Sequence, residues 1–399
     1  MEVKYFNQEV LNNISEEAKI IFNIFKNQVR LVGGSTRDLL LGLKAKDDDF
    51  ASILNPALIA EILQKNRIKA VLTHQKYGTI TAIINNKNIE ITTLRIDNEQ
   101  KGRRCEVDFI DDFAIDASRR DFSVNAIYMD YQGYIYDYFR GVEDLKNHKI
   151  RFIGDPNLRI QEDYLRILRF FRFSCEYAIQ LDEQGLQACL RNKEGLKLLS
   201  IERITKEFFL LLSSKNNLKI IEILKLLKSE KILSSIINAE FEVDKIDYFF
   251  KNINFFSDYD QDYRLRIALI FSEVVLSDFT KFNEFFKKLK LNNQIYDYFF
   301  AIRNFLELFD KDNLFQDLKA FENNIINPND YEKISKKFYY YLVFFKKDYL
   351  LDALILFTVK HKLPVVCFSN IAKMIKNINL PIFPLTGNDL LLLNFKGKE

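Results

Sequence analysis

The spacing of hydrophobic positions changes about a third of the way along the chain. In the first 140 residues, short apolar runs alternate with polar positions at a period of two, most clearly in Gly78–Ile84 and Ile89–Leu94 on either side of the Asn85–Asn88 turn. This alternation predicts a β-hairpin. Beyond Ile153, apolar residues recur every three or four positions almost to the end, which predicts helices. We therefore expect an α+β fold, with a small mixed head followed by an elongated all-helical part.

Two helices are predicted inside the head. Ser15 is a good N-cap for a first helix, which carries Ile21 and Phe25 on one face. A second helix is expected from about Thr36 to a stop at Gly42, directly after a short apolar run and a pair of glycines.

Composition narrows the class of protein. With 399 residues, 48% of them hydrophobic and 28% charged, the chain has the balance of a globular protein and is too long for one core. Only 12 Gly and 6 Pro are present, which favours long helices over a β-sandwich. No apolar run reaches membrane-spanning length, and the 4 cysteines form no CxxC pair. We expect a cytoplasmic protein without a membrane partner.

The net charge of +3 does not by itself identify a nucleic-acid binder. Basic residues are nevertheless grouped, among them the lysine pairs Lys287–Lys288, Lys336–Lys337 and Lys346–Lys347. Such pairs occur on solvated helix faces and also on RNA-binding surfaces, and the sequence leaves both interpretations open.

A glycine pair separates the apolar Leu31-Val32 from the second predicted helix. Gly33 and Gly34 would let backbone N–H groups approach a phosphate closely, and Arg37 in the first turn could bond phosphate oxygens. The same pair often forms only a turn, and the spacing fits neither the dinucleotide fingerprint nor the P-loop.

Three consecutive acids, Asp47, Asp48 and Asp49, precede a predicted strand. On an extended strand Asp47 and Asp49 share a face, while Asp48 points away. Two neighbouring carboxylates repel each other unless a divalent cation neutralises them, and two such ions can activate a hydroxyl and stabilise a leaving pyrophosphate. An isolated acidic turn is the alternative. Glu90, on a later strand, is a candidate third carboxylate.

Two arginine-rich segments complete the candidate site. Arg119-Arg120 suits a triphosphate, with Asp121 orienting one arginine, although a surface charge cluster has the same appearance. In the helix predicted over Glu162–Arg172, the arginines step by three behind Asp163, at Arg166, Arg169 and Arg172. The periodicity fits a salt-bridged amphipathic helix. It also fits base recognition, in which a carboxylate accepts from the amine of C or A and an arginine donates to the ring acceptor.

Together these segments resemble the class II tRNA nucleotidyltransferases, or CCA-adding enzymes, and their bacterial poly(A) polymerase relatives. The resemblance spans roughly residues 30–210 and rests on five motifs in order: LVGGSTRDLLLGLKAKDDDFA (Leu31–Ala51), IEITTLRID (Ile89–Asp97), RRDFSVNAI (Arg119–Ile127), DYFRGVEDL (Asp137–Leu145) and RIQEDYLRILRFFRF (Arg159–Phe173). A weaker motif, IERITKEF (Ile201–Phe208), follows these five.

The resemblance implies a polymerase-β-like nucleotidyltransferase head at residues 1–145, a base-recognising helical neck at 146–215, and a helical body and tail that bind tRNA at 216–399. It implies template-independent addition of CCA to the 3′ end of tRNA from CTP and ATP, by two-metal-ion transfer that releases pyrophosphate. By position, Asp47 and Asp49 would bind Mg²⁺, with Glu90 as a third catalytic acid. The residues implied to contact CTP or ATP are Gly34, Arg37, Arg120, Asp163, Arg166, Arg169 and Arg172.

The chain also departs from the family pattern. Ser35-Thr36 replaces the usual small residue and Val after the glycine pair. LTGNDLLLLNFKG (Leu385–Gly397) resembles a tail motif, yet relatives commonly continue where this chain stops at Glu399, which puts the grip on tRNA in question.

Two other functions compete with CCA addition. Poly(A) polymerases of the family typically carry a basic GRRF-like segment where this chain has HQKYGTIT (His74–Thr81), and the flexible loop that CCA enzymes need for the final A has a counterpart in Asn98–Cys105. Both features favour CCA addition over poly(A) synthesis. The third candidate is an RNA-binding relative without activity, which would have no need for a repelling carboxylate pair.

Overall fold

The computed structural model describes residues 3–45, 47–74, 78–97, 107–237, 239–256, 262–319, 328–344 and 346–379. The chain forms two compact units, Met1–Leu211 and Leu212–Glu399. The predicted head and neck thus fall in one unit, and the unit boundary lies a few residues before the predicted start of the body. The division into three parts stays a prediction. Among the described residues, no helix combines the length and apolar character needed to cross a membrane.

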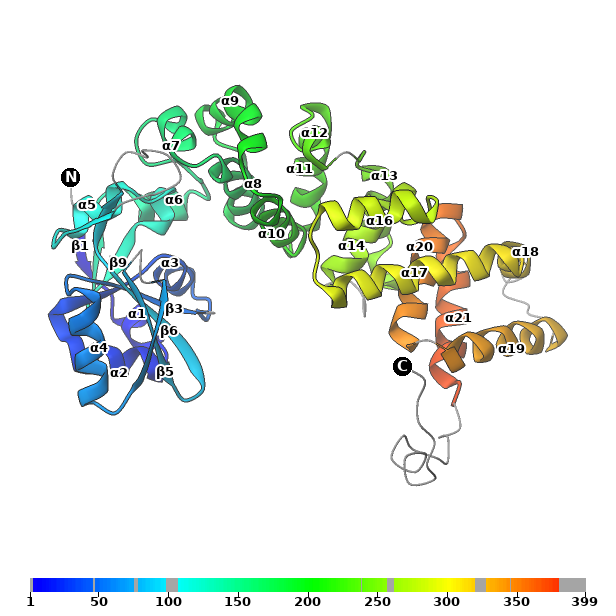
Figure 1. Cartoon of the computed structure of the whole chain (residues 1–399), viewed down its shortest axis with the longest axis horizontal. Helices are drawn as coiled ribbons and strands as arrows, with labels where there is room; N and C mark the ends of the chain where they lie inside the picture. Colours follow the sequence, from blue (N-terminus) through cyan, green and yellow to red (C-terminus); the bar gives the residue numbers. More distant parts are fainter. Residues whose placement is uncertain are drawn as a thin grey trace. The chain divides into compact units, whose positions relative to one another are not determined.

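Unit 1 is built on a mixed sheet in the order β1-β10-β9-β2-β3-β6-β5-β4 (Figure 1). A separate small sheet pairs β7 (Arg95–Asp97) with β8 (Val107–Phe109). The strands of the main sheet are β1 (Val3–Phe6), β2 (Val29–Val32), β3 (Asp48–Ser52), β4 (Lys69–His74), β5 (Thr79–Ile84), β6 (Lys87–Thr93), β9 (Ile127–Met129) and β10 (Tyr134–Asp137).

The predicted hairpin is confirmed as β5 and β6, which pair antiparallel across a tight turn at Asn85-Asn86. Both turn residues adopt positive φ, at 51° and 62°, which asparagine tolerates better than most residues. The second strand begins at Lys87, two positions earlier than the apolar alternation predicted. β6 then pairs in parallel with β3, so that strands distant in sequence become neighbours.

Alternation along the strands gives the sheet two different faces. Phe50 of β3 and Ile91 of β6 face a core that residues of α1, α2 and α4 complete. Ala51 faces a second core, formed with Phe113 and Tyr128. The predicted N-cap is confirmed, because the Ser15 hydroxyl accepts a hydrogen bond from the amide of Ala18 at the start of α2. The residues that alternate with Phe50 therefore point away from α2.

The helices of unit 1 surround this sheet and extend past it. The predicted second helix is confirmed as α3, beginning slightly earlier than expected. Four 3₁₀ segments occur in the described chain: η1 (Lys26–Gln28), η3 (Ser123–Asn125), η4 (Lys193–Leu198) and η5 (Ile253–Phe255). The α-helices up to the unit boundary are α1 (Gln8–Asn12), α2 (Glu16–Phe25), α3 (Gly34–Leu40), α4 (Pro56–Lys65), α5 (Phe113–Ser118), α6 (Gly141–Lys146), α7 (Pro156–Glu162), α8 (Leu165–Tyr177), α9 (Glu183–Asn192) and α10 (Ile201–Leu212).

The prediction of one continuous helix over Glu162–Arg172 is wrong. Asp163 is extended, with φ −153° and ψ 104°, so α7 ends at Glu162 and α8 begins at Leu165. Packing explains the break at Asp163: the ring of the next residue, Tyr164, lies so close to Gly195 that a Cβ added to Gly195 would be 2.0 Å from it. The Asp163 carboxylate then accepts from the amide of Leu165, the first residue of α8.

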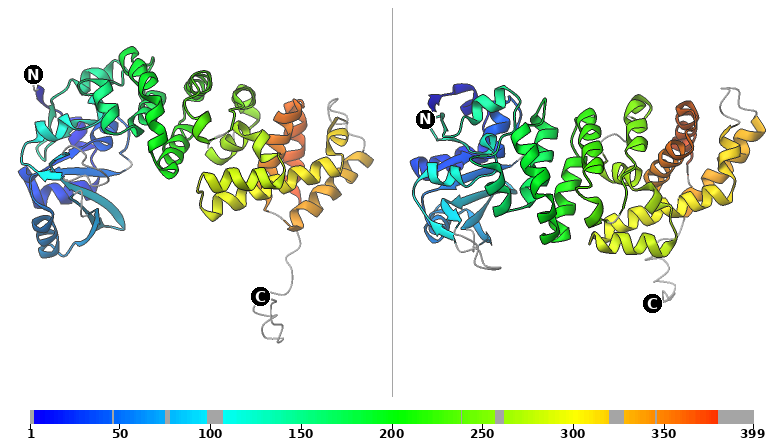
Figure 2. Two further views of the ribbon diagram at one scale, coloured as in Figure 1. Left: turned by 45° about the horizontal axis from the view of Figure 1, so that its top comes forward. Right: turned by 90° about the horizontal axis from the view of Figure 1, so that it is seen from above.

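Unit 2 is helical throughout its described residues (Figure 2). Long helices α17 and α20 pack against each other, and α21 packs on α20. The elements are α11 (Asn217–Ser229), α12 (Ser234–Ile237), α13 (Val243–Lys251), α14 (Tyr263–Ile270), α15 (Ser272–Val275), α16 (Phe279–Lys288), α17 (Asn293–Lys311), α18 (Leu314–Lys319), α19 (Pro328–Phe344), α20 (Lys347–His361) and α21 (Val365–Asn377).

One carboxyl group lies inside the core of unit 2. Asp352 on α20 is 5% exposed and accepts a hydrogen bond of 2.9 Å from the hydroxyl of Tyr298. Burial raises the pKa of Asp352 to about 7, and the negative charge of Asp262 acts in the same direction.

Replacing this carboxyl group should change how stability depends on pH. The native state keeps the Asp352 proton up to about pH 7, whereas an unfolded chain releases it near ~3.9. The contribution of the parent residue is therefore fully present below the unfolded pKa and is lost as pH rises through the folded pKa. Asp352→Asn should unfold at higher urea concentration than the parent at about pH 8, with little difference near pH 4. Asp297→Asn, exposed on α17, is the control, and a pH-independent difference for Asp352→Asn would contradict the assignment.

Candidate active site

The three consecutive acids divide between the two faces of the sheet. Asp48 is 8% exposed and accepts a short hydrogen bond from Ser15, the N-cap of α2. Asp49 alternates with Phe50 and points to the opposite face, toward Arg120. Asp47 lies exposed just before the strand, near enough for its charge to act on Asp49. The prediction that Asp48 points away from Asp49 is confirmed.

The parallel pairing of β3 and β6 brings a third carboxylate to this face. Asp49 and Glu90 are register partners on the two strands. Burial raises the pKa of Asp49 to about 6, and the charges of Glu90 and Asp47 raise it further, against the lowering effect of Arg120. The site therefore holds negative charge that is costly to concentrate there without a cation.

The donor set suits a magnesium ion that is completed by substrate. Among the described residues, no three His, Cys, Asp or Glu side chains lie close enough together to hold a metal ion. Mg²⁺ is usually bound by one or two carboxylates together with water and substrate phosphates, which is the set that Asp47 and Asp49 can provide. The role of Glu90 as a further ligand stays a prediction.

Ser35 fixes the position of these acids. Its hydroxyl donates to the backbone carbonyl of Asp47 (2.8 Å) and accepts from the backbone amide of Asp49 (3.0 Å). Gly33, with φ 71°, turns the chain into α3 so that Ser35 reaches β3. Sequence reasoning treated Ser35 only as a mild departure from the family pattern, yet it ties the first turn of α3 to the acidic segment.

Arg120 faces the acids and is held by a residue that the sequence reasoning missed. Its guanidinium lies 3.7 Å from the position of an added Cβ on Gly33, and it donates to Asp116 (3.1 Å) and to the Tyr128 hydroxyl (2.9 Å). Burial alone would raise the pKa of Asp116, but the charges of Arg120 and Arg119 outweigh it and lower the pKa to about 2. The spacing of Asp116 and Arg120, one helical turn apart, was the available signal.

The expected role of Asp121 is different in the structure. Its carboxylate accepts from Arg169 (2.6 Å) on α8 and from the amide of Asn125 (3.0 Å), whereas Asp116 orients the two preceding arginines. Asp121 thereby joins the end of α5 to the arginine stripe of α8.

All three arginines of that stripe make ion pairs. Arg166 pairs with Glu162 (2.6 Å) at the end of α7. Arg169 pairs with Asp121, and it also approaches Glu207 of α10 (3.5 Å), which Arg172 contacts at 2.7 Å. The salt-bridged interpretation of the helix is thus present in the structure. Glu207, absent from the sequence-based site, is its central acid.

Asp163 and Arg37 are also engaged. Asp163 pairs with Arg203 of α10 (2.8 Å), another residue that sequence reasoning missed. The buried guanidinium of Arg37 donates to its neighbour Asp38 (2.8 Å), to Asn125 (2.7 Å) and to the Tyr177 hydroxyl (2.7 Å). Its predicted contact with phosphate stays a prediction, as do the predicted nucleotide contacts of Gly34, Arg120 and the α8 stripe.

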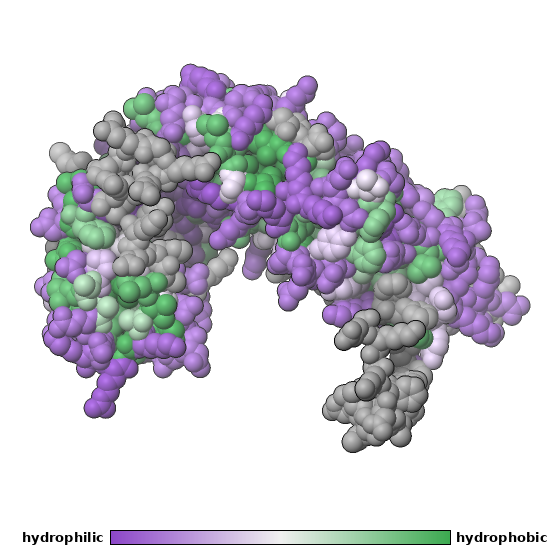
Figure 3. Space-filling model, viewed as in Figure 1, coloured by the Kyte–Doolittle hydropathy of each residue, from purple (hydrophilic) through white to green (hydrophobic). Residues whose placement is uncertain are grey.

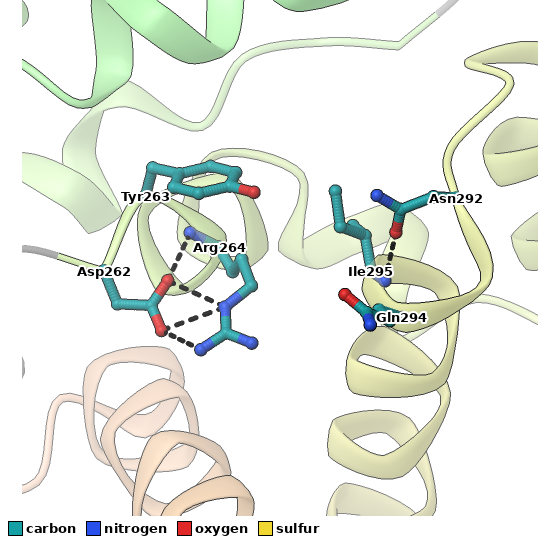
Figure 4. Close-up of a pocket in the computed structure, with 6 residues that line it drawn as sticks. All are labelled: Asp262, Tyr263, Arg264, Asn292, Gln294 and Ile295. Carbon is teal, nitrogen blue, oxygen red and sulfur yellow. Dashed lines mark hydrogen bonds and ion pairs between the residues drawn. The ribbon is translucent and has the colours of Figure 1, made fainter. Parts of the chain in front are cut away.

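Two hollows lie outside this constellation. One is in unit 2, about 450 Å³ in volume, where the Arg264–Asp262 ion pair (2.5 Å) lies across from Asn292 and Gln294 at the start of α17 (Figure 4). The other is in unit 1, near Asp155 and Gln187. Neither contains a residue of the predicted site.

The lysine pairs keep both of their interpretations. Lys336 pairs with Glu332 (2.6 Å) and Lys337 with Asp317 (2.6 Å), while Lys287 and Lys288 lie in the last turn of α16. Hydrophilic side chains cover much of the face drawn in Figure 3, as expected for solvated helices. Neither arrangement distinguishes a solvated surface from one that contacts RNA.

Comparison with known proteins shows which proteins the region of the site resembles. Residues 29–151 match the poly A polymerase head domain, a range that includes Asp47, Asp49, Glu90 and Arg120. Over 266 residues the chain is 38% identical to the human mitochondrial CCA tRNA nucleotidyltransferase 1, covering 64% of this chain and 60% of that protein. Residues 29–151 are thus similar to the poly A polymerase head domain, and a longer part of the chain is similar to a protein named as a CCA tRNA nucleotidyltransferase.

Solved structures of CCA-adding enzymes share the fold. The Thermotoga maritima CCA-adding enzyme complexed with tRNA has a TM-score of 0.67 at 20% identity, covering 100% of this chain and 91% of that one. The Bacillus stearothermophilus enzyme in complex with CTP has a TM-score of 0.64 at 23% identity, covering 98% and 89%. The sequence matches are shorter, since the chain spans about half the length of the curated relatives it matches. The predicted α+β fold class is confirmed.

Removing the central acid of the stripe should destabilise unit 1. Glu207 is 6% exposed and accepts from Arg172, so Glu207→Gln removes the counter-charge of the largely buried Arg172 and weakens that of Arg169, which keeps Asp121. We expect a loss on the order of 1–3 kcal/mol in the free energy of unfolding. Urea unfolding measures it, with Glu202→Gln, exposed on the same helix, as control. Equal stabilities of the two variants would show that the pairing contributes nothing.

Proposed function

We propose that this protein adds CCA, as two CMP and one AMP, to the 3′ end of tRNA without a template, using CTP and ATP and releasing pyrophosphate. The observation that carries the proposal is the placement of Asp49 beside Glu90 and opposite Arg120, with Asp47 at the open end of the strand. That arrangement combines acids for a divalent cation with a cation for a triphosphate. The match to the poly A polymerase head domain and the relatives named as CCA tRNA nucleotidyltransferases or CCA-adding enzymes support it.

In this proposal the acids and Arg120 act on opposite ends of the reacting phosphate. Asp47 and Asp49 would hold Mg²⁺, which when bound lowers the pKa of the attacking 3′ hydroxyl and neutralises the leaving pyrophosphate. Arg120, fixed by Asp116 and Tyr128, would bind triphosphate oxygens. Ser35 would keep the acids in place through its hydrogen bonds to the backbone of Asp47 and Asp49.

Asp163 and Arg166 would read the base. Each Asp163 oxygen accepts one hydrogen bond, from Leu165 or Arg203, and so keeps a lone pair for an exocyclic amine. Arg166 uses both Nη1 hydrogens and one Nη2 hydrogen on partners among the described residues. Its Nε–H and the second Nη2 hydrogen are left to donate to the ring nitrogen beside that amine. C and A share this donor and acceptor pattern, and U and G reverse it.

Two alternatives remain distinct from CCA addition. Poly(A) synthesis would use the same acids but only ATP, and the segments that favour CCA addition, including Asn98–Cys105, lie mostly outside the described residues, as does Leu385–Gly397 of the tail motif. A non-catalytic RNA-binding protein is disfavoured by the raised pKa of Asp49, because burying a repelled carboxylate is a cost without a benefit to binding. We further propose a cytoplasmic location, while noting that the human relative is named mitochondrial.

One incubation separates these functions. The protein is mixed with tRNA lacking CCA, Mg²⁺ and labelled CTP, ATP or both, and the products are resolved at single-nucleotide length. CCA addition requires two labelled C followed by one A, with no extension beyond. A long A ladder with ATP alone indicates poly(A) synthesis, and binding without extension indicates the non-catalytic relative.

Substitution of the acids tests the catalytic assignment. Asp49→Asn and Asp47→Asn should reduce incorporation by at least ~10³-fold while tRNA binding persists, because transfer depends on cation placement. Asp49→Asn should also raise the midpoint of thermal unfolding of the metal-free protein, since it removes repulsion from Glu90 and Asp47. Asp48→Asn, on the other face, should be milder in activity. Turnover near the parent's rate in either of the first two variants would refute the assignment.

Base selectivity tests the reading pair. Asp163→Ala should lower use of CTP and ATP and narrow the preference over UTP and GTP, because each mispaired polar group costs on the order of 1–3 kcal/mol, roughly ten- to a hundredfold. Incorporation of all four nucleotides is compared on one tRNA for Asp163→Ala, Arg166→Ala and the parent. If both variants keep the parent's preference for CTP over UTP, the base is read elsewhere and α8 serves as scaffold.

A further inference from the structure

Two arginines at the junction of α7 and α8 share a single carboxylate. Arg159 contacts both oxygens of Glu162 (2.7 and 2.6 Å), and Arg166 contacts one of them (2.6 Å). The two arginine side chains are only 12% and 13% exposed. Holding two cations together under a shared acid is costly, and the buried Nε of Arg159 has no hydrogen-bond partner among the described residues. Stability alone does not explain this arrangement.

The other ends of both arginines reach the backbone beside the catalytic face. Arg159 Nη2 donates to the carbonyl of Arg120 (2.8 Å), and Arg166 Nη2 donates to the carbonyl of Arg119 (3.2 Å). These carbonyls follow the end of α5, where helical partners are missing. Arg159 of α7 and Arg166 of α8 therefore bind the carbonyls of two consecutive residues, Arg120 and Arg119.

Arg120 is consequently fixed at two points. Asp116 and Tyr128 hold its guanidinium toward Gly33 and Asp49, while Arg159 holds its main chain. Arg166, the base-reading arginine of the proposed function, is tied to Arg159 again through the Arg159 carbonyl (2.7 Å). Arg159 thus connects Arg120, proposed to bind the triphosphate, with Arg166, proposed to bind the base.

We propose that Arg159 is a positioning residue that sets the distance between Arg120, at the triphosphate, and Arg166, at the base. This inference rests on the proposed function. When the base is bound by Asp163 and Arg166, Arg120 is then already at the right distance to bind the triphosphate. Arg159 itself takes no part in base reading or in the transfer step.

Double-variant kinetics test this role. Arg159→Met should raise KM for CTP and for ATP by a similar factor, about tenfold, as expected for loss of one charge-assisted hydrogen bond, and should keep the preference for CTP over UTP. In an Arg120→Met background the same change should have less than about a twofold effect, because the residue it positions is gone. Arg159→Lys retains one donor and should recover much of the loss. Arg191→Met, exposed on α9, is the matched control.

Each outcome is distinct from a failure of the proposed function. If the parent incorporates neither CMP nor AMP, the proposed function fails. With an active parent, an equal KM effect in both backgrounds, a collapse of the preference for CTP, or a change no larger than that of Arg191→Met overturns the role of Arg159. If Arg159→Met does not fold, as judged by thermal unfolding, Arg159→Gln, which also lacks the positive charge, replaces it in both backgrounds.

Discussion

Repulsion among carboxylates at the edge between β3 and β6 is the constraint on which the rest of unit 1 depends. Asp49 and Glu90 are direct partners across a parallel pair, and Asp47 adds its charge from the end of the strand. The fold compensates for this from outside the acidic segment, with Arg120 as the facing cation and Ser35 as the backbone tie. A cation and a triphosphate would complete the neutralisation, and in the metal-free protein the surrounding residues have to hold the acids in place.

Rigidity comes from arginines that each have fixed partners. Asp116 pairs with the arginines after α5, and Asp121 and Glu207 pair with Arg169. Glu162 pairs with Arg159 and Arg166 at the junction of α7 and α8. Asp121, Glu207 and Glu162 each pair with an arginine of α8 from outside that helix. Asp116 lies one helical turn before Arg120. Because removal of one acid would leave a buried guanidinium unpaired, these elements are expected to behave as one cooperative unit.

Motif and periodicity were sufficient for the fold class, the β5–β6 hairpin, the Ser15 cap and the facing of Asp48. They were insufficient wherever a contact joined residues distant in sequence. The parallel pairing of β3 with β6 has no local signal, and the short strands β1, β9 and β10 are defined by their neighbours in the sheet more than by their own sequence. The break at Asp163 was missed for the same reason, because it depends on Tyr164 packing over Gly195 some thirty residues later. Arg203 and Glu207 lie in the segment IERITKEF and Asp116 lies one helical turn before Arg120, but neither signal identified these residues as partners of Asp163 and the predicted arginines.

The two interpretations of α8, salt-bridged scaffold and base-reading surface, do not exclude each other. An arginine has five N–H donors and a carboxylate has about four acceptor sites, so a group can be anchored and still present unused positions. Arg166 is anchored through its Nη atoms, and Asp163 through one bond on each oxygen. Anchoring restricts the directions in which the remaining donors and lone pairs point, which is what selection among four similar bases requires. The helix break contributes to this, because an extended Asp163 can accept from the first amide of α8 with one oxygen and pair with Arg203 through the other. In a continuous helix the same carboxylate would project from the side of the helix without either anchor.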